Sequence, residues 1–468
     1  MIPSQFLTRL LASGALVLSG IVTSSASAAG KAEASAEEVG NIHQISAEVC
    51  KTCHQEVYKQ WAESMHSRST ALKDPLHGAF YQMEAGSPTE EGVLHKKSGQ
   101  YPVCLSCHAP NAAIDKTTKL DARPAYAEGV NCVACHTLKT YKGIKTPDGK
   151  QQLGLSAYEV AKNLQGPAGF PRGLAKLTAG SDPFGGAGAA GADASQKPNP
   201  HLGEAVDFEG KHIPAMVMEA NPSLMKSSDA CMGCHDQRDN PHGVPLCQTG
   251  NEYIDSGSNV NCLSCHMPLA NGLADHTMGG GHNKAVLARA ALFDLKVEKS
   301  GKATEAVKAA KAAAKVGKQD KADGPGNNLK ASVRIKNQQP HSLPTGAPFR
   351  NLYVKLTAYD DKGEVVWESA KGHPAESDPQ AYFSYSMVDD TGKPAPPPVA
   401  TKAGPDSRLK PHEDRTLTYE IPAKGVVLVR GELYYGLLWP GLAKQFSQLP
   451  EEVRTPMLVS VVERPIAP

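Results

Sequence analysis

Five copies of one short pattern account for the reactive side chains of this sequence. Each copy reads Cys-x-x-Cys-His, and the five copies use ten of the 11 cysteines. Residues i, i+3 and i+4 of a helical turn share one face, so both thiols can add to the two vinyl groups of one porphyrin while the histidine reaches its iron. The pattern therefore predicts five covalently attached haem c groups. The attaching cysteines are Cys50 and Cys53, Cys104 and Cys107, Cys132 and Cys135, Cys231 and Cys234, and Cys262 and Cys265, and the proximal histidines are His54, His108, His136, His235 and His266.

Zinc, a redox-active cysteine pair and disulfides are the other common uses of paired cysteines. Zinc is satisfied by cysteine pairs and does not need a histidine after every pair. A thioredoxin-like pair normally occurs once in a chain. Disulfides in an exported protein do not explain five pairs that are each followed by histidine. Haem attachment explains both cysteines and the adjacent histidine together.

The second axial ligand of each iron decides what the haems can do, because an iron with an open position can bind small molecules. The chain has 17 histidines, of which five belong to the motifs, so 12 remain. His66 is a candidate because Tyr58 and Trp61 precede it at helical spacing and make an apolar face that can lie on a porphyrin. His276 and His282 are candidates because they flank three glycines, which let the backbone approach a flat macrocycle.

The other histidines before residue 290 are weaker candidates. His43 and His77 lie in polar surroundings, where a distal ligand and a surface residue fit the sequence equally well. Four more lie in Gly-, Pro- or Lys-rich stretches and are expected to be exposed. These are His95, His201, His212 and His242. Methionines near the motifs are expected to fill gaps in the core, and the odd thiol, Cys247, to be a plain buried cysteine.

His341 lies in a later part of the chain. It follows an expected strand that ends near Lys336, and Pro340 and Pro344 stiffen the loop around it, so its side chain would be held in one direction. We expect His341 either to reach from the carboxyl-terminal domain to the distal face of a haem or to be an ordinary loop residue.

The first residues have the pattern of a secretory signal peptide. Arg9 precedes an apolar run from Leu10 to Val22, and small residues end at Ala28. The run is too short and too often interrupted for a membrane span, so we expect cleavage after Ala28 and no membrane span afterwards. The formal net charge is +1, and Arg9 is the only charged side chain of the signal, so the cleaved chain is neutral. Nucleic acid is therefore not an expected partner. The expected location is the periplasm, with the extracellular space or the outer membrane as alternatives.

Four segments are expected along the chain. They are a signal peptide (1–28), a pentahaem cytochrome c domain (29–287), a strand with a Lys- and Ala-rich linker (288–328) and a β-sandwich domain (329–468). The motifs are too far apart for each to have a core of side chains, so the porphyrins are expected to serve as the core. The fold class is therefore a mostly irregular and α-helical multihaem domain followed by an all-β domain.

In the carboxyl-terminal domain the pattern of apolar residues changes to a period of two. Ala331, Val333 and Ile335 alternate with polar residues, and similar alternation recurs up to about residue 464, which predicts antiparallel strands with one buried face. Residues Asp360 to Gly363 are expected to form a hairpin turn. Seven or so short strands favour an immunoglobulin-like sandwich.

The motifs resemble those of multihaem cytochromes c, including the tetrahaem cytochrome that takes electrons from hydroxylamine oxidoreductase. The resemblance covers residues 45–285 and rests on the Trp-x-x-Ser-x-His segment that ends at His66, on Gly-Val-Asn before Cys132, and on the last motif with the histidines after it. It implies that His66, His276 and His282 are distal ligands. The fifth motif and the β domain depart from the tetrahaem pattern, so the resemblance does not supply the partner. The loop from His341 to Gly346 resembles one in larger members that carry a β domain.

Three functions follow from these features. The leading hypothesis is an electron relay through five haems between redox proteins, such as a quinol-oxidising membrane cytochrome and a terminal reductase or oxidase. The second is a multihaem oxidoreductase that acts on a small nitrogen or sulfur species at an open iron. No motif histidine is replaced by lysine, which disfavours an ammonia-forming nitrite reductase. The third is a subunit of an extracellular cytochrome filament. An electron carrier is favoured over an enzyme, and no catalytic residue is assigned.

Overall fold

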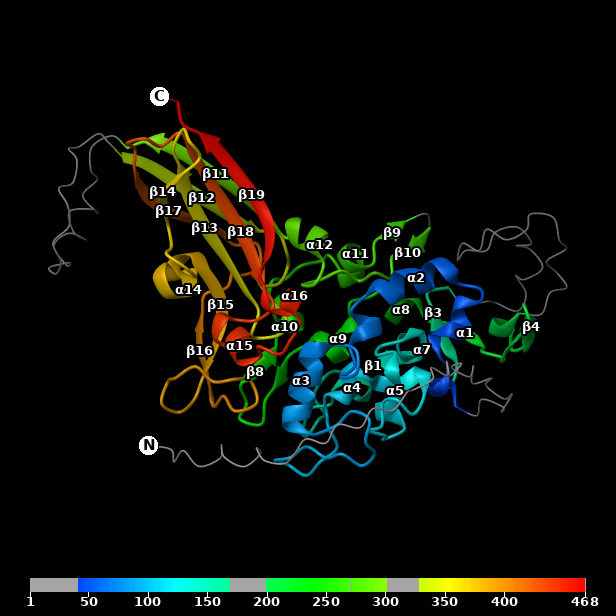
Figure 1. The fold of residues 1–468 in the computed structure, drawn as a ribbon. Helices are drawn as coiled ribbons and strands as arrows, with labels where there is room; N and C mark the ends of the chain where they lie inside the picture. Colours follow the sequence, from blue (N-terminus) through cyan, green and yellow to red (C-terminus); the bar gives the residue numbers. More distant parts are fainter. Residues whose placement is uncertain (1–40, 169–198, 271, 301–327, 468) are drawn as a thin grey trace, which may run out of the picture. The chain divides into compact units, whose positions relative to one another are not determined.

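The computed structural model of the protein describes residues 41–168, 199–270, 272–300 and 328–467 (Figure 1). The expected signal peptide and the Lys- and Ala-rich part of the linker lie outside these residues. No helix in the described ranges is long and apolar enough to cross a membrane.

The described part of residues 41–290, which we call the haem region, consists of short helices and strands of two to four residues joined by irregular segments. Its longest helix has 10 residues. The helices are η1 (Ile42–Gln44), α1 (Ala47–Lys51), α2 (Gln55–Glu63), η2 (His66–Arg68), α3 (Pro75–Glu84), α4 (Leu105–His108), α5 (Pro110–Ile114), α6 (Pro124–Ala127), α7 (Cys132–His136), η3 (Gly154–Ala157), η5 (Pro200–Leu202), α8 (Pro222–Met225), α9 (Asp229–His235), α10 (Thr249–Asp255), α11 (Cys262–His266) and α12 (Lys284–Ala288). The strands are β1 (Leu138–Tyr141), β2 (Tyr158–Val160), β3 (Leu164–Gly166), β4 (Val206–Phe208), β5 (Lys211–Ile213), β6 (Met218–Ala220), β7 (Arg238–Asp239), β8 (Pro245–Cys247), β9 (Leu269–Ala270) and β10 (Leu273–Ala274). This confirms the expected architecture of short helices at the motifs.

The segment from the first motif to His66 does not form one continuous helix, although Tyr58 and Trp61 have helical spacing. Helix α1 ends at Lys51, and α2 runs only from Gln55 to Glu63. Ser64 takes an extended backbone, and its hydroxyl donates a hydrogen bond to the Trp61 carbonyl at 2.7 Å, which competes with helix continuation. His66 therefore begins the separate turn η2.

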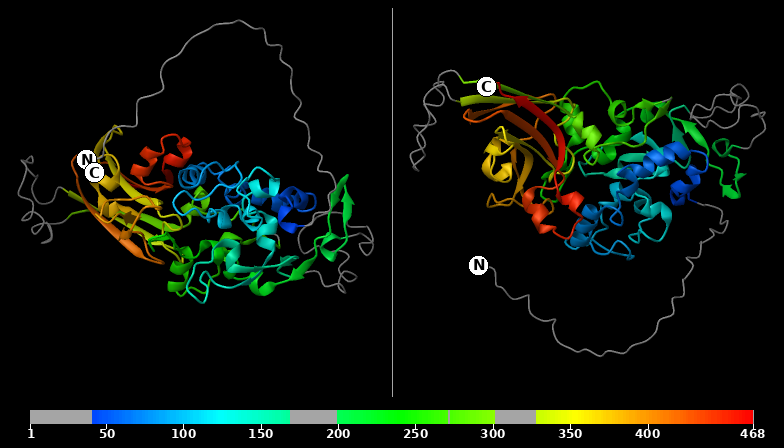
Figure 2. Two further views of the ribbon diagram at one scale, coloured as in Figure 1. Left: turned by 90° about the horizontal axis from the view of Figure 1, so that it is seen from below. Right: turned by 45° about the horizontal axis from the view of Figure 1, so that its top comes forward.

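Residues 291–467, which we call the β region, form two antiparallel sheets. One sheet has the strand order β11-β12-β17 and the other β16-β15-β13-β18-β19, with β14 paired to β13. The strands are β11 (Ala291–Lys299), β12 (Asn328–Asn337), β13 (Asn351–Tyr359), β14 (Val365–Glu368), β15 (Tyr382–Val388), β16 (Lys402–Asp406), β17 (Asp414–Pro422), β18 (Leu428–Gly436) and β19 (Met457–Pro465), and the helices are α14 (Pro374–Ser377), η6 (Pro379–Ala381), α15 (Pro440–Gln445) and α16 (Glu451–Arg454). Figure 2 shows the yellow-to-red strands gathered separately from the blue and cyan helices.

Alternation along the strands builds the core of the β region. Val333 and Ile335 of β12 and Val354 and Leu356 of β13 are fully buried, and they belong to one cluster that joins both sheets. The strands predicted from the period of two are therefore confirmed, and so is the turn at Asp360, whose N–H donates to the Glu364 carbonyl at 3.0 Å. The strand expected within 288–328 is β11, and it pairs with β12 along its whole length. Strand β16 was not predicted because its sequence, Lys-Ala-Gly-Pro-Asp, has no alternation.

Side chains of the haem region pack directly on the β region. Leu76 of α3 shares a cluster with Leu442 and Phe446 in and beside α15. The Phe80 and Phe349 rings stack with their centroids 5.4 Å apart. A buried ion pair joins Glu252 of α10 to an arginine that follows β16, as described below.

Candidate haem-binding site

Each motif lies on or directly beside its own short helix, and in three of these helices the side chain of the residue before the first turn caps the helix. The Ser46 side chain accepts a hydrogen bond from the Glu48 N–H of α1, Asn131 accepts from Ala134 of α7, and Asn261 accepts from Ser264 of α11. These caps satisfy N–H groups that a helix start leaves unpaired. The helical turn then places the two cysteines and the histidine of each motif on one side, as haem attachment requires.

Four motif histidines face a histidine from outside the motifs. The ring centroids of His54 and His201 are 5.8 Å apart, with 32° between the planes. Those of His235 and His66 are 6.0 Å apart at 84°.

The other two pairs have similar, nearly parallel planes but different separations. The centroids of His266 and His341 are 6.4 Å apart at 23°. Those of His108 and His77 are only 4.0 Å apart, at 34°.

These separations can be compared with the distance across an iron. A metal–imidazole bond is about 2 Å long and the bonded nitrogen lies about 1.1 Å from the ring centre, so two imidazoles on opposite sides of one iron have centroids about 6.3 Å apart. Three of the four pairs are within about half an ångström of this value. The His77 and His108 rings are closer than this, and they would separate by about 2 Å around an iron.

The His77 ring also has a buried polar atom whose hydrogen-bonding capacity is unsatisfied. Its Nε2 atom is buried and has no hydrogen-bond partner in the described part of the chain. A buried polar atom without a partner is costly, and native proteins rarely leave one. An iron at this nitrogen would satisfy it, so the residues at the second motif fit a haem.

Backbone carbonyls hold the candidate rings in one tautomer. The Nδ1 atoms of three motif histidines lie 2.8–3.0 Å from a carbonyl oxygen, and those of four other histidines lie 2.7–3.1 Å from one. With the proton on Nδ1, the Nε2 lone pair is left for a metal. The motif histidines are His108, His136 and His266, and the others are His77, His201, His276 and His341.

Burial favours the neutral form of two of the facing rings, those of His66 and His235. Desolvation, together with the nearby His235 and His266, lowers the pKa of His66 to about 4. Desolvation is also the main cause that lowers the pKa of His235 to about 4. A neutral imidazole is the form that binds a metal.

His276 is the remaining candidate for the third motif. Its Nδ1 contacts the Ala274 carbonyl at 2.7 Å, and its N–H donates to Oε1 of Gln60 at 2.9 Å. After desolvation, the charge of His136 is the strongest influence that lowers the pKa of His276. His276 therefore lies in the neighbourhood of His136.

Two of the sequence candidates do not face a motif histidine in the described residues. His43 is buried, and its Nδ1 lies 3.3 Å from Oδ1 of Asn111, in the polar network around the cap of the third motif. His282 is exposed, and no ring contact joins it to another histidine in the described ranges.

His201 is the residue that sequence reasoning missed. It was expected to be exposed because it lies in a polar, Pro-containing stretch, but η5 holds it half-buried beside His54. Asn199 caps this turn by accepting from the His201 N–H at 2.9 Å. An Asn-Pro-His segment gives no periodic signal, and His201 lies 147 positions from its partner, so only the three-dimensional fold reveals it.

The five motifs form one connected set. The thiols of Cys50 and Cys132 lie close enough that each shifts the pKa of the other, downward for Cys50 and upward for Cys132, so the first motif is next to the third. Cys135 of the third motif acts electrostatically on Cys234 of the fourth.

The fourth motif also adjoins the second and the fifth. Cys107 and Cys234 lie close enough that each shifts the pKa of the other, and the same holds for Cys231 and Cys262. The fourth motif thus has the second, third and fifth as neighbours, and the first adjoins the third. The exposed motif cysteines are Cys53 and Cys265, in the first and fifth motifs.

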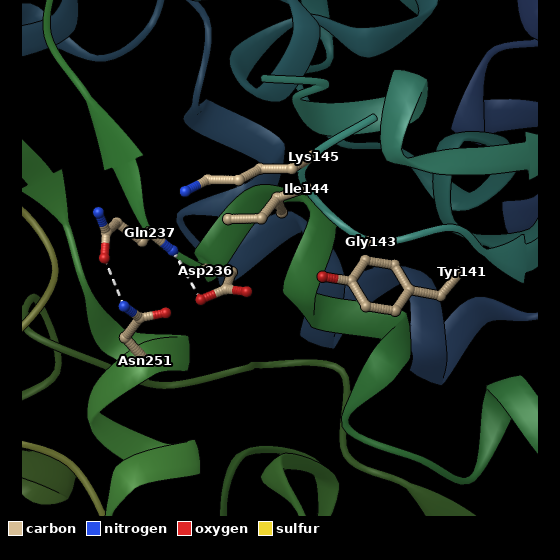
Figure 3. Close-up of a pocket in the computed structure, with 7 residues that line it drawn as sticks. All are labelled: Tyr141, Gly143, Ile144, Lys145, Asp236, Gln237 and Asn251. Atoms are coloured by element: carbon tan, nitrogen blue, oxygen red, sulfur yellow. Dashed lines mark hydrogen bonds between the residues drawn. The ribbon is translucent and has the colours of Figure 1, made fainter. Parts of the chain in front are cut away.

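A pocket of about 370 Å³ lies next to the fourth motif (Figure 3). Its wall includes Asp236, which directly follows His235. On the other side are Tyr141 at the end of β1 and Lys145 in the loop that follows. The residues that line it include no histidine or cysteine, so none of the candidate iron ligands opens into it.

Comparison with known proteins gives one family match and one strong match to a solved structure. The family model for cytochrome c554 and c-prime matches residues 49–137. A crystal structure of a penta-heme cytochrome c552 from Thermochromatium tepidum is 57% identical in sequence, with a TM-score of 0.79, over 91% of this chain and 100% of that chain. An X-ray structure of a structural genomics target, SoR45, aligns at 10% identity and a TM-score of 0.15 over 32% of this chain and 74% of that chain, which is too weak to support an argument. No curated protein matches.

The identity and coverage of the Thermochromatium structure extend over both the haem region and the β region. Five Cys-x-x-Cys-His motifs on separate helices, each with histidines nearby, supply what five haems need. The chain therefore belongs to the penta-heme cytochrome c552 family of multihaem c-type cytochromes, and it binds five haem c groups covalently.

Proposed function

We propose that this cytochrome is an electron relay in which two histidines bind every iron. Haem c supplies one-electron chemistry when bound. The observation that carries the proposal is the pairing of four motif histidines with four others across distances of 4.0–6.4 Å. Two histidines on each iron leave no open position for a substrate.

Four of the proposed ligand pairs follow from these contacts, and the fifth, His276 with His136, follows from the electrostatic influence of His136 on His276. His201 is assigned to the first motif, His77 to the second, His276 to the third, His66 to the fourth and His341 to the fifth. His43 and His282 are then not ligands. The covalent attachment sites are proposed at the ten motif cysteines.

The proposed path follows the contacts between motifs. The rate of electron transfer falls steeply with distance. Electrons should therefore pass most efficiently between haems whose motif cysteines lie next to each other. The path runs between the first and fifth motifs, where exposed Cys53 and Cys265 support entry and exit. The fourth motif is its branch point, because it adjoins three others.

Several finer features are part of the same proposal. The kinship with the tetrahaem partner of hydroxylamine oxidoreductase is supported by the match of residues 49–137 to the cytochrome c554 model. Two antiparallel sheets around one core support an immunoglobulin-like sandwich, with the domain boundary near residue 290 because β11 belongs to the sheet.

We propose export to the periplasm after loss of residues 1–28. The partners are proposed to be redox proteins, such as a quinol-oxidising membrane cytochrome and a terminal reductase or oxidase.

Counting spin states tests the relay. The oxidised protein should show five low-spin haems by electron paramagnetic resonance, and the reduced protein should bind little carbon monoxide. A stoichiometric carbon monoxide complex at one haem, with turnover of nitrite, hydroxylamine or tetrathionate, would instead support the oxidoreductase. Mass spectrometry should find five haems, and one fewer when both cysteines of a motif are replaced by alanine.

A further inference from the structure

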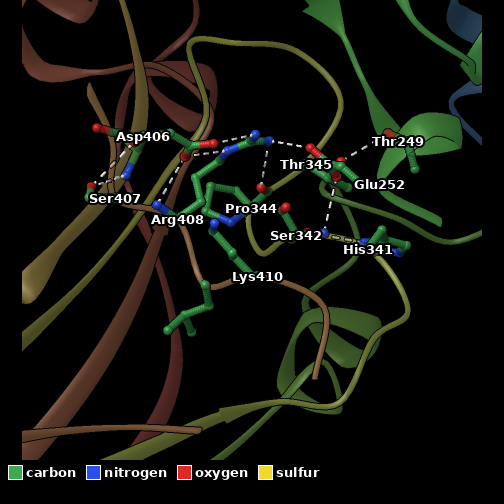
Figure 4. A network of polar contacts seen from close by, with 12 residues as sticks. Thr249, Glu252, His341, Ser342, Pro344, Thr345, Asp406, Ser407, Arg408 and Lys410 are labelled. Atoms are coloured by element: carbon green, nitrogen blue, oxygen red, sulfur yellow. Dashed lines mark hydrogen bonds and ion pairs between the residues drawn. The ribbon is translucent and has the colours of Figure 1, made fainter. Parts of the chain in front are cut away.

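A buried ion pair lies where the loop of His341 meets the haem region (Figure 4). Oε1 of Glu252 on α10 lies 2.6 Å from a terminal nitrogen of Arg408, which follows β16. The Arg408 and Glu252 side chains are only 8% and 9% exposed. A buried pair of this kind is often no more stabilising than apolar residues of the same size. Its presence therefore calls for a role other than bulk stability.

Every polar atom of the Glu252 carboxylate is directed at the His341 loop or at Arg408. Its Oε2 accepts the Ser342 N–H at 3.0 Å and the Thr345 hydroxyl at 2.6 Å. Arg408 in turn is held by the Asp406 carboxylate through two bonds of 2.9 and 2.8 Å. The three charged side chains thus form one unit that contacts the backbone directly after His341.

The peptide unit that carries His341 is fixed at both of its polar ends. The carbonyl of His341 accepts from Nδ2 of Asn337 at 2.8 Å, and the N–H of the same peptide unit, on Ser342, donates to Glu252. The next residue, Leu343, exchanges two backbone hydrogen bonds with Leu409, beside Arg408. These bonds leave the backbone at His341 little freedom to rotate.

The ring itself is oriented by its own loop. Its Nδ1 lies 3.0 Å from the Ser342 carbonyl, which leaves Nε2 for the iron, and the ring lies nearly parallel to His266. An axial ligand must be held within about half an ångström of its productive position. The residues that fix the 341–342 peptide therefore determine whether His341 reaches the iron.

We propose that Glu252 and Arg408 are positioning residues that hold His341 as the distal ligand of the haem at Cys262 and Cys265, and that their charges set the potential of that haem. The proposal rests on His341 being that ligand. Because Glu252 comes from α10 and Arg408 from the β region, the same contact makes the coordination of this haem depend on the docking of the two regions.

The charges of Glu252 and Arg408 predict that removing one or the other shifts the midpoint potential of this haem in opposite directions. Glu252 and Asp406 carry two negative charges against one positive charge on Arg408, and oxidation adds a positive charge at the iron. Glu252→Gln, whose amide oxygen can still accept from Ser342, should keep the haem low-spin and raise its midpoint potential. Arg408→Met should lower the midpoint potential of the same haem. A purely structural role predicts no such pair of opposite shifts.

Complete removal of the Glu252 carboxylate should weaken the binding of His341 to the iron. Glu252→Leu leaves the Ser342 N–H and the Thr345 hydroxyl without their acceptor, so one haem of five should become partly high-spin and the reduced protein should bind up to one carbon monoxide. If Glu252→Leu is not recovered as folded protein, Thr345→Val, which removes one bond to the carboxylate, should shift the potential of the same haem. The matched control is Arg430→Met, which breaks an exposed ion pair to Glu463 in the same region and should leave all five haems unchanged.

The experiments distinguish a failure of His341 as a ligand from a failure of Glu252 and Arg408 as positioning residues. His341→Ala should convert one haem to high spin, and an unchanged spectrum in that variant would refute the ligation itself. If His341→Ala does convert a haem but the Glu252 and Arg408 variants change only the thermal unfolding temperature, with all potentials and carbon monoxide binding as in the parent, the positioning role is refuted while the ligation stands.

Discussion

His66 and His235 face each other with their ring centroids 6.0 Å apart and their planes at 84°, although 169 positions separate them in the chain. His66 follows the first motif closely, yet it faces the histidine of the fourth. In the proposed assignment, the ligand of one haem is therefore supplied by the segment that carries another, and the haems are not expected to fold as independent units.

The first prediction concerns His66→Ala. The variant should lose the distal ligand of the haem attached at Cys231 and Cys234 and leave the haem at Cys50 and Cys53 low-spin. Electron paramagnetic resonance and carbon monoxide binding measure this as one high-spin haem of five. Nearly perpendicular imidazole planes leave two iron d orbitals close in energy, so this haem should also give the most anisotropic low-spin signal of the parent protein. That signal should be the one that disappears, and loss of a rhombic signal instead would reject the assignment.

The second prediction uses Gly129, whose backbone is packed against the segment of His66. Gly129 has a φ of +73°, and a β-carbon there would lie 2.3 Å from the His66 carbonyl oxygen. Gly129→Ala should therefore displace His66 and destabilise the protein by about 2–4 kcal/mol, from backbone strain and overpacking together. Chemical denaturation measures the loss, and spin state at the fourth motif reports the displacement.

A matched control separates the clash from the strain. Gly210 has nearly the same φ, +74°, but nothing lies within 4 Å of its added β-carbon. Gly210→Ala should cost only the strain, about 1–2 kcal/mol, and should leave every haem low-spin. Equal effects of the two substitutions would show that the contact with His66 is unimportant.

The third prediction tests the ligand that sequence reasoning missed. His201→Ala should convert the haem at the first motif to high spin, because His201 is the ring that faces His54. His212→Ala is the control, since His212 is exposed and its Nδ1 lies 2.9 Å from the carboxylate of Asp207. Addition of free imidazole to the His201→Ala protein should restore the low-spin spectrum. A low-spin first haem in the variant without imidazole would assign the ligand elsewhere.

Local chemistry and short-range periodicity made much of this structure predictable. The motif helices follow from Cys-x-x-Cys-His itself, and the strands from alternation such as that of Val333 and Ile335. The ligand pairs are different in kind, because His66 and His201 meet their partners only through the packing of distant segments. His43 and His282 had local surroundings as suitable as those of His77, but the fold directs only His77 at a motif histidine. A sequence records which rings are available and does not record which ring faces which iron.

The last prediction concerns protein made without haem. The main core cluster has 25 buried apolar residues, of which all but Leu287 and Ala290 belong to the β region. The largest such cluster confined to the described part of the haem region, around Tyr81 and Leu105, has nine. Porphyrins are therefore expected to supply the rest of the core of the haem region, and a chain of its size without them buries too little apolar surface to fold. With all ten motif cysteines replaced by alanine, limited proteolysis should degrade the haem region and leave strands β11–β19 protected, as identified by mass spectrometry. The haem-loaded parent, digested in parallel, should resist in both regions. If the haem-free chain resisted equally in both regions, the side chains alone would suffice to fold the haem region.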